Sequence, residues 1–245
     1  MIHKEKIVDK YKVIAIVAAI LLILIIIVLS SRTRIVKTYN KYMRVDNKHN
    51  ITGKQLAFFA KQQLGLDDLK FALTQEKLGD AYSYKYNTLI MSEDVCNYAS
   101  LSSMAIVAHE LGHAMQYRDN SPLFNTVILT NRITRFTSGF VVPLFIIGLF
   151  FSIFQYPTPD FGYILIIISF SLFVLQILNK LLNIPLEYDA SSRALKYLKE
   201  NNLLTHGELS KARKLLSIAA QTYVASLFDE LIPFKRKKNS KKKKK

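Results

Sequence analysis

Three long apolar runs constrain this chain more than any other feature of its sequence. They span residues 13–29, 138–154 and 162–178, and none of them contains a charged residue. Each has about the length that an α-helix needs to cross the hydrocarbon core of a bilayer. A core hairpin in a soluble protein would account for the last two runs, but three such runs favour a membrane protein. We therefore expect a mainly α-helical, multi-pass membrane protein with three transmembrane helices.

The charge balance agrees with this interpretation. The chain is 50% hydrophobic and yet carries a formal net charge of +16, a combination that fits apolar spans with Lys and Arg at the membrane surface. A basic chain can also bind nucleic acid, but no helix-turn-helix, zinc-finger or RNA-binding signature is present, so we expect no nucleic-acid partner. The single cysteine, Cys96, rules out an intramolecular disulfide and favours a reducing compartment.

The apolar runs divide the chain into six parts. The first three are a polar N-terminal segment (1–12), a first transmembrane helix (13–31) and a region that carries the metal motif (32–135). The last three are a transmembrane helical hairpin (136–182), a pair of C-terminal helices (183–233) and a basic tail (234–245). The first helix lacks a clear cleavage site, so we interpret it as an uncleaved anchor rather than a signal peptide. The Lys-rich tail is of a kind that binds anionic lipid head groups, although a merely solvated, disordered tail fits it equally well.

A short motif indicates the chemistry. The stretch AIVAHELGHAMQ, residues 105–116, lies in a predicted helix over residues 102–117, with Ser102 or Ser103 as its N-cap. On a helix, His109 and His113 lie on one face and can both bind one Zn²⁺. Glu110 is turned about 100° away, where it is poorly placed as a ligand but well placed beside a metal-bound water. The motif therefore predicts a zinc peptidase with one catalytic ion.

The segments around the motif have recognisable local signals. Thr52 is a plausible N-cap for an amphipathic helix that ends near Gly65, and residues 81–92, AYSYKYNTLIMS, alternate as a small strand pair or one irregular strand. Such a strand can pair with an extended substrate. Thr205 and Glu208 form the capping box of the last helix.

A catalytic zinc site needs a third protein ligand and one open position. The metzincin plan would use Asp119, but Gln116 stands where that plan needs a glycine. The plan of site-2 intramembrane proteases needs an Asp from a Leu-Asp-Gly motif, which is absent, and Asp160 is the nearest substitute. The remaining gluzincin plan uses a Glu on a separate downstream helix, and Glu187 is the candidate.

Spacing alone leaves the role of Glu187 open. We expect a helix to begin at Pro185 near the membrane surface, with Glu187 in its first turn. A Glu at that position is either a metal ligand or simply a residue favoured by the helix dipole. Asp189 and Glu200 compete with it as ligands.

The combination of segments resembles a known family. The stretch SEDVCNYASLSSMAIVAHELGHAMQ, then a hairpin, then PLEYDASSRAL is similar to the YugP-type neutral zinc metallopeptidases, membrane relatives of the HtpX- and Oma-type peptidases. The resemblance covers nearly the whole chain without the Lys tail. It implies that His109, His113 and Glu187 bind the zinc ion and that Glu110 is the general base.

The chain departs from these relatives at two places. HtpX-type relatives usually have an Asp where this chain has Ser191, and they often read HYDP where residues 81–84 read AYSY. The sequence does not identify the donor that stabilises the oxyanion, and the candidates are Arg193, Tyr188 and Tyr223.

We expect the chain to be a membrane-bound zinc endopeptidase. Its expected partners are protein or peptide substrates, membrane proteins among them, and the lipid bilayer, and membrane protein quality control is a candidate role. Two alternatives are a site-2-type intramembrane protease and a non-catalytic zinc-binding scaffold. The presence of Glu110 favours catalysis, because a purely structural zinc site has no use for it.

The distribution of basic residues predicts the orientation of the chain in the cell membrane. Arg132, Arg135 and Lys180 lie at one end of the predicted hairpin, whereas its connecting loop has no Lys or Arg. The positive-inside rule therefore places the catalytic region and the C-terminus in the cytoplasm. The charges on the two sides of the first span are nearly balanced and do not decide.

Overall fold

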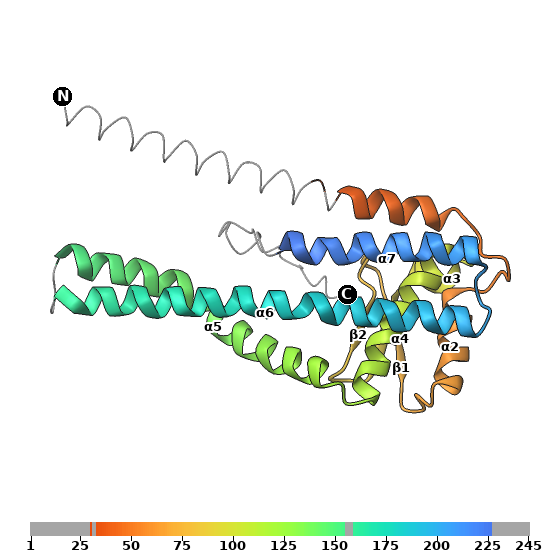
Figure 1. Cartoon of the computed structure of the whole chain (residues 1–245), viewed down its shortest axis with the longest axis horizontal. Helices are drawn as coiled ribbons and strands as arrows, with labels where there is room; N and C mark the ends of the chain where they lie inside the picture. The colour runs from red at the N-terminus through yellow and green to blue at the C-terminus, as the bar shows by residue number, and fades with distance from the viewer. Residues whose placement is uncertain (1–29, 31–32, 155–158, 227–245) are drawn as a thin grey trace, which may run out of the picture.

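The structure is a computed structural model that describes residue 30 and residues 33–154 and 159–226. The expected first transmembrane helix and the basic tail lie outside the described residues. A helix over residues 33–43 precedes the labelled elements of Figure 1, which are α2 Gly53–Gln63, β1 Lys70–Thr74, β2 Ala81–Ser83, β3 Thr88–Ser92, α3 Glu93–Asn97, α4 Leu101–Arg118, α5 Pro122–Phe154, α6 Pro159–Glu200 and α7 His206–Ser226.

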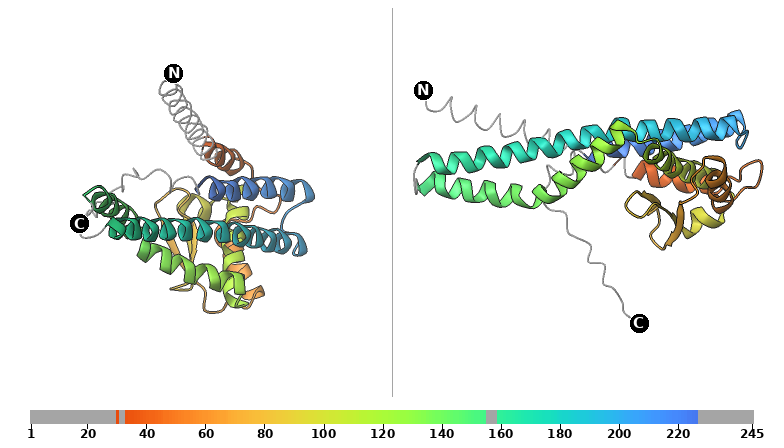
Figure 2. Two further views of the ribbon diagram at one scale, coloured as in Figure 1. Left: turned by 60° about the vertical axis from the view of Figure 1, so that its left-hand side comes forward. Right: turned by 90° about the horizontal axis from the view of Figure 1, so that it is seen from below.

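Two long helices extend from a compact part that contains the sheet. Figure 1 shows the hairpin of α5 and α6 projecting to the left, with α2, α3, α4 and the strands gathered at the right. Helix α6 runs through both parts, and α7 packs alongside its second half (Figures 1 and 2). The predicted mainly helical fold with a small strand element beside the motif helix is confirmed.

The hairpin has the length and composition of a pair of membrane spans. Among the described residues, α5 and α6 are the two helices long and apolar enough to cross a membrane. Only 6% of the most apolar window of α5 and 17% of that of α6 are buried inside the protein, whereas the core hairpin of a soluble domain would be mostly covered. The helices touch through small residues, since a Cβ on Gly148 would lie 2.9 Å from the Gly162 carbonyl oxygen.

The expected helix start at Pro185 is wrong. Helix α6 continues from Pro159 to Glu200 without a break, and Pro185 lies inside it. A proline removes one helical hydrogen bond, but long helices that are packed against neighbours tolerate this loss, and α4, α5 and α7 all pack on α6. Glu187 therefore sits in the interior of a helix rather than in its first turn, on the same element as an apolar run.

The three strands form a small mixed sheet in the order β1-β3-β2. Strand β1 pairs in parallel with β3, and β2 pairs antiparallel with β3. The β2–β3 pair confirms the predicted strand pair, whereas β1 was not predicted. Because β3 is the central strand, it has no free edge for a substrate, and β2 is the edge strand beside α4.

The helix caps are mostly those that the sequence indicates. Thr52 and Gln55 form a capping box at the start of α2, and Thr205 pairs with Glu208 at the start of α7. The N-cap of α4 is Ser100, not Ser102 or Ser103, because its hydroxyl accepts a bond from the Ser103 N–H at 3.0 Å. Ser102 is buried within the first turn and donates to the Tyr39 carbonyl instead.

Candidate metal centre

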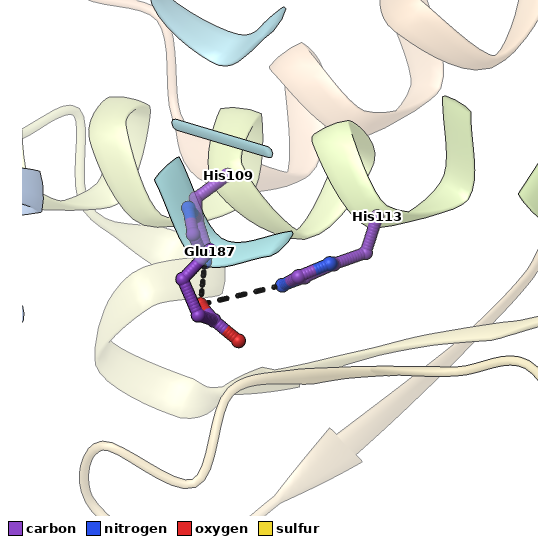
Figure 3. A group of neighbouring side chains, drawn as sticks. All are labelled: His109, His113 and Glu187. Carbon is purple, nitrogen blue, oxygen red and sulfur yellow. Dashed lines mark hydrogen bonds and ion pairs between the residues drawn. The ribbon is translucent and has the colours of Figure 1, made fainter. Parts of the chain in front are cut away.

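The two motif histidines and a downstream glutamate converge between α4 and α6. His109 and His113 leave the same face of α4, with ring centroids 4.8 Å apart, and both point toward Glu187 from α6 (Figure 3). The exposed fractions of the three side chains are only 14%, 13% and 8%. This clustering matches the expectation for the three candidate ligands, although their function as ligands stays a prediction.

The distances from Glu187 to the two histidines suit a small tetrahedral ion. Glu187 Oε2 lies 3.1 Å from His109 Nε2 and 3.6 Å from His113 Nε2, and all candidate ligand atoms lie within 4.8 Å of one another. Zinc bonds of about 2.0–2.1 Å in a tetrahedral site put ligand atoms roughly 3.3 Å apart. Two imidazoles and one carboxylate are also a donor set that catalytic zinc commonly uses, so these residues fit a zinc ion.

Gly112, between the two histidines, allows α4 and α6 to approach closely. A Cβ at this position would lie 2.4 Å from the carbonyl oxygen of Ala190 on α6. Any side chain here would therefore collide with backbone. Ala190 is three residues after Glu187, so this contact sets the distance between Glu187 and the histidines.

The outer ring nitrogens of the histidines have partners of their own. His109 Nδ1 lies 3.1 Å from the Ser191 hydroxyl, and His113 Nδ1 lies 2.9 Å from Gln116 Oε1. The Gln116 amide is oriented by its Nε2, which donates to the Leu186 carbonyl at 3.0 Å and to Asp189 Oδ2 at 2.8 Å. Its Oε1 must therefore accept from His113 Nδ1, so Nε2 is the ring nitrogen that a metal would use.

Sequence reasoning missed this function of Gln116. In the sequence, the residue stands out only because it replaces the glycine of the metzincin plan. The usable signal is its position three residues after His113, on the same helix face. Ser191, which the sequence already marks as a departure from HtpX-type relatives, places a neutral hydroxyl beside His109.

Glu110 is held beside the cluster by the sheet. Its Oε2 accepts a hydrogen bond of 2.7 Å from the backbone N–H of Tyr82 in β2. Burial raises the pKa of Glu110, while the neighbouring His109 and His113 act in the opposite direction. The Tyr82 bond fixes one oxygen and leaves the other to take up a proton, which is the requirement for a general base.

The competing acidic residues are engaged elsewhere. Asp119 accepts from Arg118 and Arg193, at 2.8 and 2.6 Å, and Asp189 accepts from Arg193 at 2.8 Å. Glu200 is exposed and lies 3.9 Å from Lys196. Asp160 lies in the first turn of α6, and 27 residues of helix, about 40 Å, separate it from Glu187.

Of the three expected oxyanion donors, the two whose side chains the structure describes do not contact the cluster. Arg193 is occupied by Asp119 and Asp189. Tyr188 is 49% exposed and lines a hollow of about 600 Å³ between α6 and α7 that does not border His109 or Glu110. The side chain of Tyr223 lies outside the described residues.

Comparison with known proteins points to the same chemistry. The sequence profile of a family described as "Putative neutral zinc metallopeptidase" matches residues 16–236. The "Putative membrane protease YugP" of Bacillus subtilis (strain 168) is 28% identical over 205 residues, which cover 81% of this chain and 86% of the relative. No solved structure matches the chain. The matched residues include α4, the hairpin and Glu187.

Proposed function

Since this chain belongs to the family of neutral zinc metallopeptidases, we propose that it is a membrane-bound endopeptidase with one catalytic Zn²⁺. His109, His113 and Glu187 would hold the ion, and Glu110 would be the general base. The family relationship implies protein or peptide substrates. The proposal agrees with the implications of the sequence resemblance.

One observation carries this proposal above the others. Three candidate ligand atoms converge from two helices. Glu110 is not one of them, and a hydrogen bond from the Tyr82 N–H holds it beside the group. A structural zinc site usually fills its fourth position with a protein ligand. In the described residues only three candidate ligands meet here, which is the pattern of a site that keeps one position for water or substrate.

Each residue of the site has a separate role in the proposed peptide hydrolysis. When bound, Zn²⁺ acts as a Lewis acid and lowers the pKa of a coordinated water. Glu110 takes a proton on the oxygen that Tyr82 does not engage and then delivers it to the leaving amine. Gln116 and Ser191 hold the two imidazoles with their Nε2 atoms toward the metal position.

The hairpin supports a location at a membrane. Helix α6 carries both an apolar run that ends at Leu178 and, nine residues later, Glu187. Nine helical residues span about 14 Å, so the metal position would lie just beyond the lipid head groups. We propose that the substrates include membrane proteins cleaved near the membrane surface, and membrane protein quality control is a role that such a site suits.

Two other functions find less support. A site-2-type intramembrane protease would need Asp160 at the metal, but the length of α6 puts it about 40 Å from Glu187. A non-catalytic zinc scaffold would not need Glu110, whose placement by Tyr82 serves no ligand role.

The proposal is tested by Glu110→Gln in the full-length protein purified in detergent. The substitution removes the proton acceptor and keeps an oxygen that can accept from Tyr82. We expect bound zinc to remain and hydrolysis of casein or an unfolded membrane protein to be abolished. Hydrolysis at the wild-type rate would show that Glu110 is not the base.

A further inference from the structure

A cavity opens beside the metal centre on the side of α7. It has a volume of about 280 Å³ and borders His109, Glu110 and Glu187. Its walls come from the helix over residues 33–43, the loop between β1 and β2, and the helices α4, α6 and α7. A side chain of a substrate bound at the metal would be close enough to enter it.

Most of the cavity wall is apolar. The larger aliphatic side chains that line it are those of Ile35, Leu78, Ile106, Leu215 and Leu216. Leu78 has a backbone φ of 58°, in the left-handed region that branched side chains rarely adopt and that costs on the order of 1–3 kcal/mol. Strained residues of this kind concentrate at ligand-binding positions, and here the strained residue forms part of the wall.

The polar part of the wall is acidic. Asp80 lines the cavity, and its two oxygens accept from the N–H and the hydroxyl of Ser92 at 2.6 and 3.1 Å. Burial raises the pKa of Asp80, while the hydrogen bonds from Ser92 act in the opposite direction, and a nearby cation would stabilise the anion further. Glu110 and Glu187 also face the cavity, and among the described residues that line it there is no Lys or Arg.

Tyr39 adds a polar group to the cavity wall. It lines the same cavity and is 1% exposed, and among the described residues none has hydrogen-bond geometry to its phenolic oxygen. Burial raises the pKa of Tyr39, and the nearby Ser92 side chain lowers it. A buried hydroxyl without a partner is unusual and suggests a missing ligand. The nearby Lys77 lies over the Tyr39 ring and pairs with Asp94 at 3.6 Å, and it does not line the cavity.

We infer that this cavity is a specificity pocket for a lysine or arginine side chain of the substrate. The methylene groups pack against Ile35, Leu78 and Leu215, and the cationic end pairs with Asp80 and donates to the Tyr39 oxygen. This inference rests on the proposed peptidase function. It adds the requirement that the substrate has a lysine or arginine at a fixed position relative to the cleaved bond.

The test uses a set of fluorogenic peptides with one neutral parent sequence. Lysine or norleucine, which has a similar aliphatic chain without the charge, is placed in turn at each of the positions flanking the cleaved bond. We expect the zinc-loaded wild type to favour lysine over norleucine at one position by at least about tenfold in kcat/KM, the range of a charge-assisted hydrogen bond.

Two variants and a control test which residues cause the preference for lysine. Asp80→Asn keeps an acceptor for the Ser92 N–H and should abolish the lysine preference while norleucine peptides are still cleaved. Tyr39→Phe removes only the unpartnered oxygen, so its folding should be unaffected, and it should reduce the preference by roughly two- to tenfold. Asp94→Asn removes a nearby acid that does not line the cavity and should leave the preference unchanged.

The outcomes separate this inference from the proposed function. Two results would contradict the specificity pocket without contradicting the peptidase function. One is cleavage with no position at which lysine is preferred, and the other is an Asp80→Asn variant that prefers lysine as strongly as wild type does. If no peptide is cleaved, the proposed function fails, and fluorescence anisotropy of labelled lysine and norleucine peptides on the zinc-loaded protein still tests the pocket. Equal binding of the two peptides would then overturn it.

Discussion

Gly112 on α4 lies directly against Ala190 on α6, so closely that a Cβ on Gly112 would meet the Ala190 carbonyl oxygen at 2.4 Å. That is about 1 Å short of an ordinary van der Waals contact. The atom in the way belongs to backbone, which cannot rotate aside as a flexible side chain can. The contact makes the spacing of the two segments that carry the candidate ligands depend on the absence of a side chain at Gly112.

Gly112→Ala should therefore separate α4 from α6 and move Glu187 away from His109 and His113. We expect a destabilisation of about 1–3 kcal/mol, typical of overpacking, and a clear loss of zinc affinity in competition with a chromophoric chelator. Gly207→Ala is the matched control, because a Cβ there meets nothing within 4 Å. Wild-type zinc affinity in Gly112→Ala would contradict the spacing argument.

Gln116 should matter for metal affinity although it is not a ligand. Gln116→Met keeps the approximate shape and removes the bonds to His113, Leu186 and Asp189. Loss of a side chain that hydrogen-bonds and orients a metal-binding histidine typically lowers metal affinity by about 10- to 100-fold. The same chelator competition measures it.

Tyr197→Phe is the control for Gln116→Met, because it removes a part-buried hydrogen bond from a core side chain to Gln63 without touching the cluster. It should lower the unfolding temperature and leave zinc affinity unchanged. If both variants bind zinc like wild type, the Gln116 amide does not orient His113.

The orientation in the membrane is predicted from Arg132, Arg135 and Lys180, which place the metal centre in the cytoplasm. A cysteine introduced at Ser121, in the connection between α4 and α5, should resist a membrane-impermeant thiol reagent in intact cells and react after lysis. The native Cys96 is buried and gives little background. Strong labelling in intact cells would mean that the centre faces outward.

The sequence predicts the local part of the site because helical periodicity determines it. The spacing of His109, Glu110 and His113 defines their relative positions on any helix, and α4 forms within a residue or so of the expected limits. The position of Glu187 depends instead on packing between α4 and α6. Spacing alone could not choose between Glu187, Asp189 and Glu200, and the resemblance to a family decided.

Two features of the fold depend on contacts that local patterns do not contain. Strand β1, residues 70–74, has mostly exposed or half-buried side chains and is a strand because it pairs with β3. Pro185 favours a helix start when only its neighbours are considered, yet helices packed on α6 keep it continuous. The cavity beside Asp80 likewise combines segments that are far apart in the chain.

The central claim is that His109, His113 and Glu187 together hold one zinc ion. Its most direct test is the zinc content of full-length protein by inductively coupled plasma mass spectrometry, for wild type and for Glu187→Ala. We predict one zinc per chain in wild type and a large loss in Glu187→Ala, with Asp119→Ala and Asp160→Ala unchanged. Full zinc occupancy in Glu187→Ala, or loss of the metal in Asp160→Ala, would contradict the assignment.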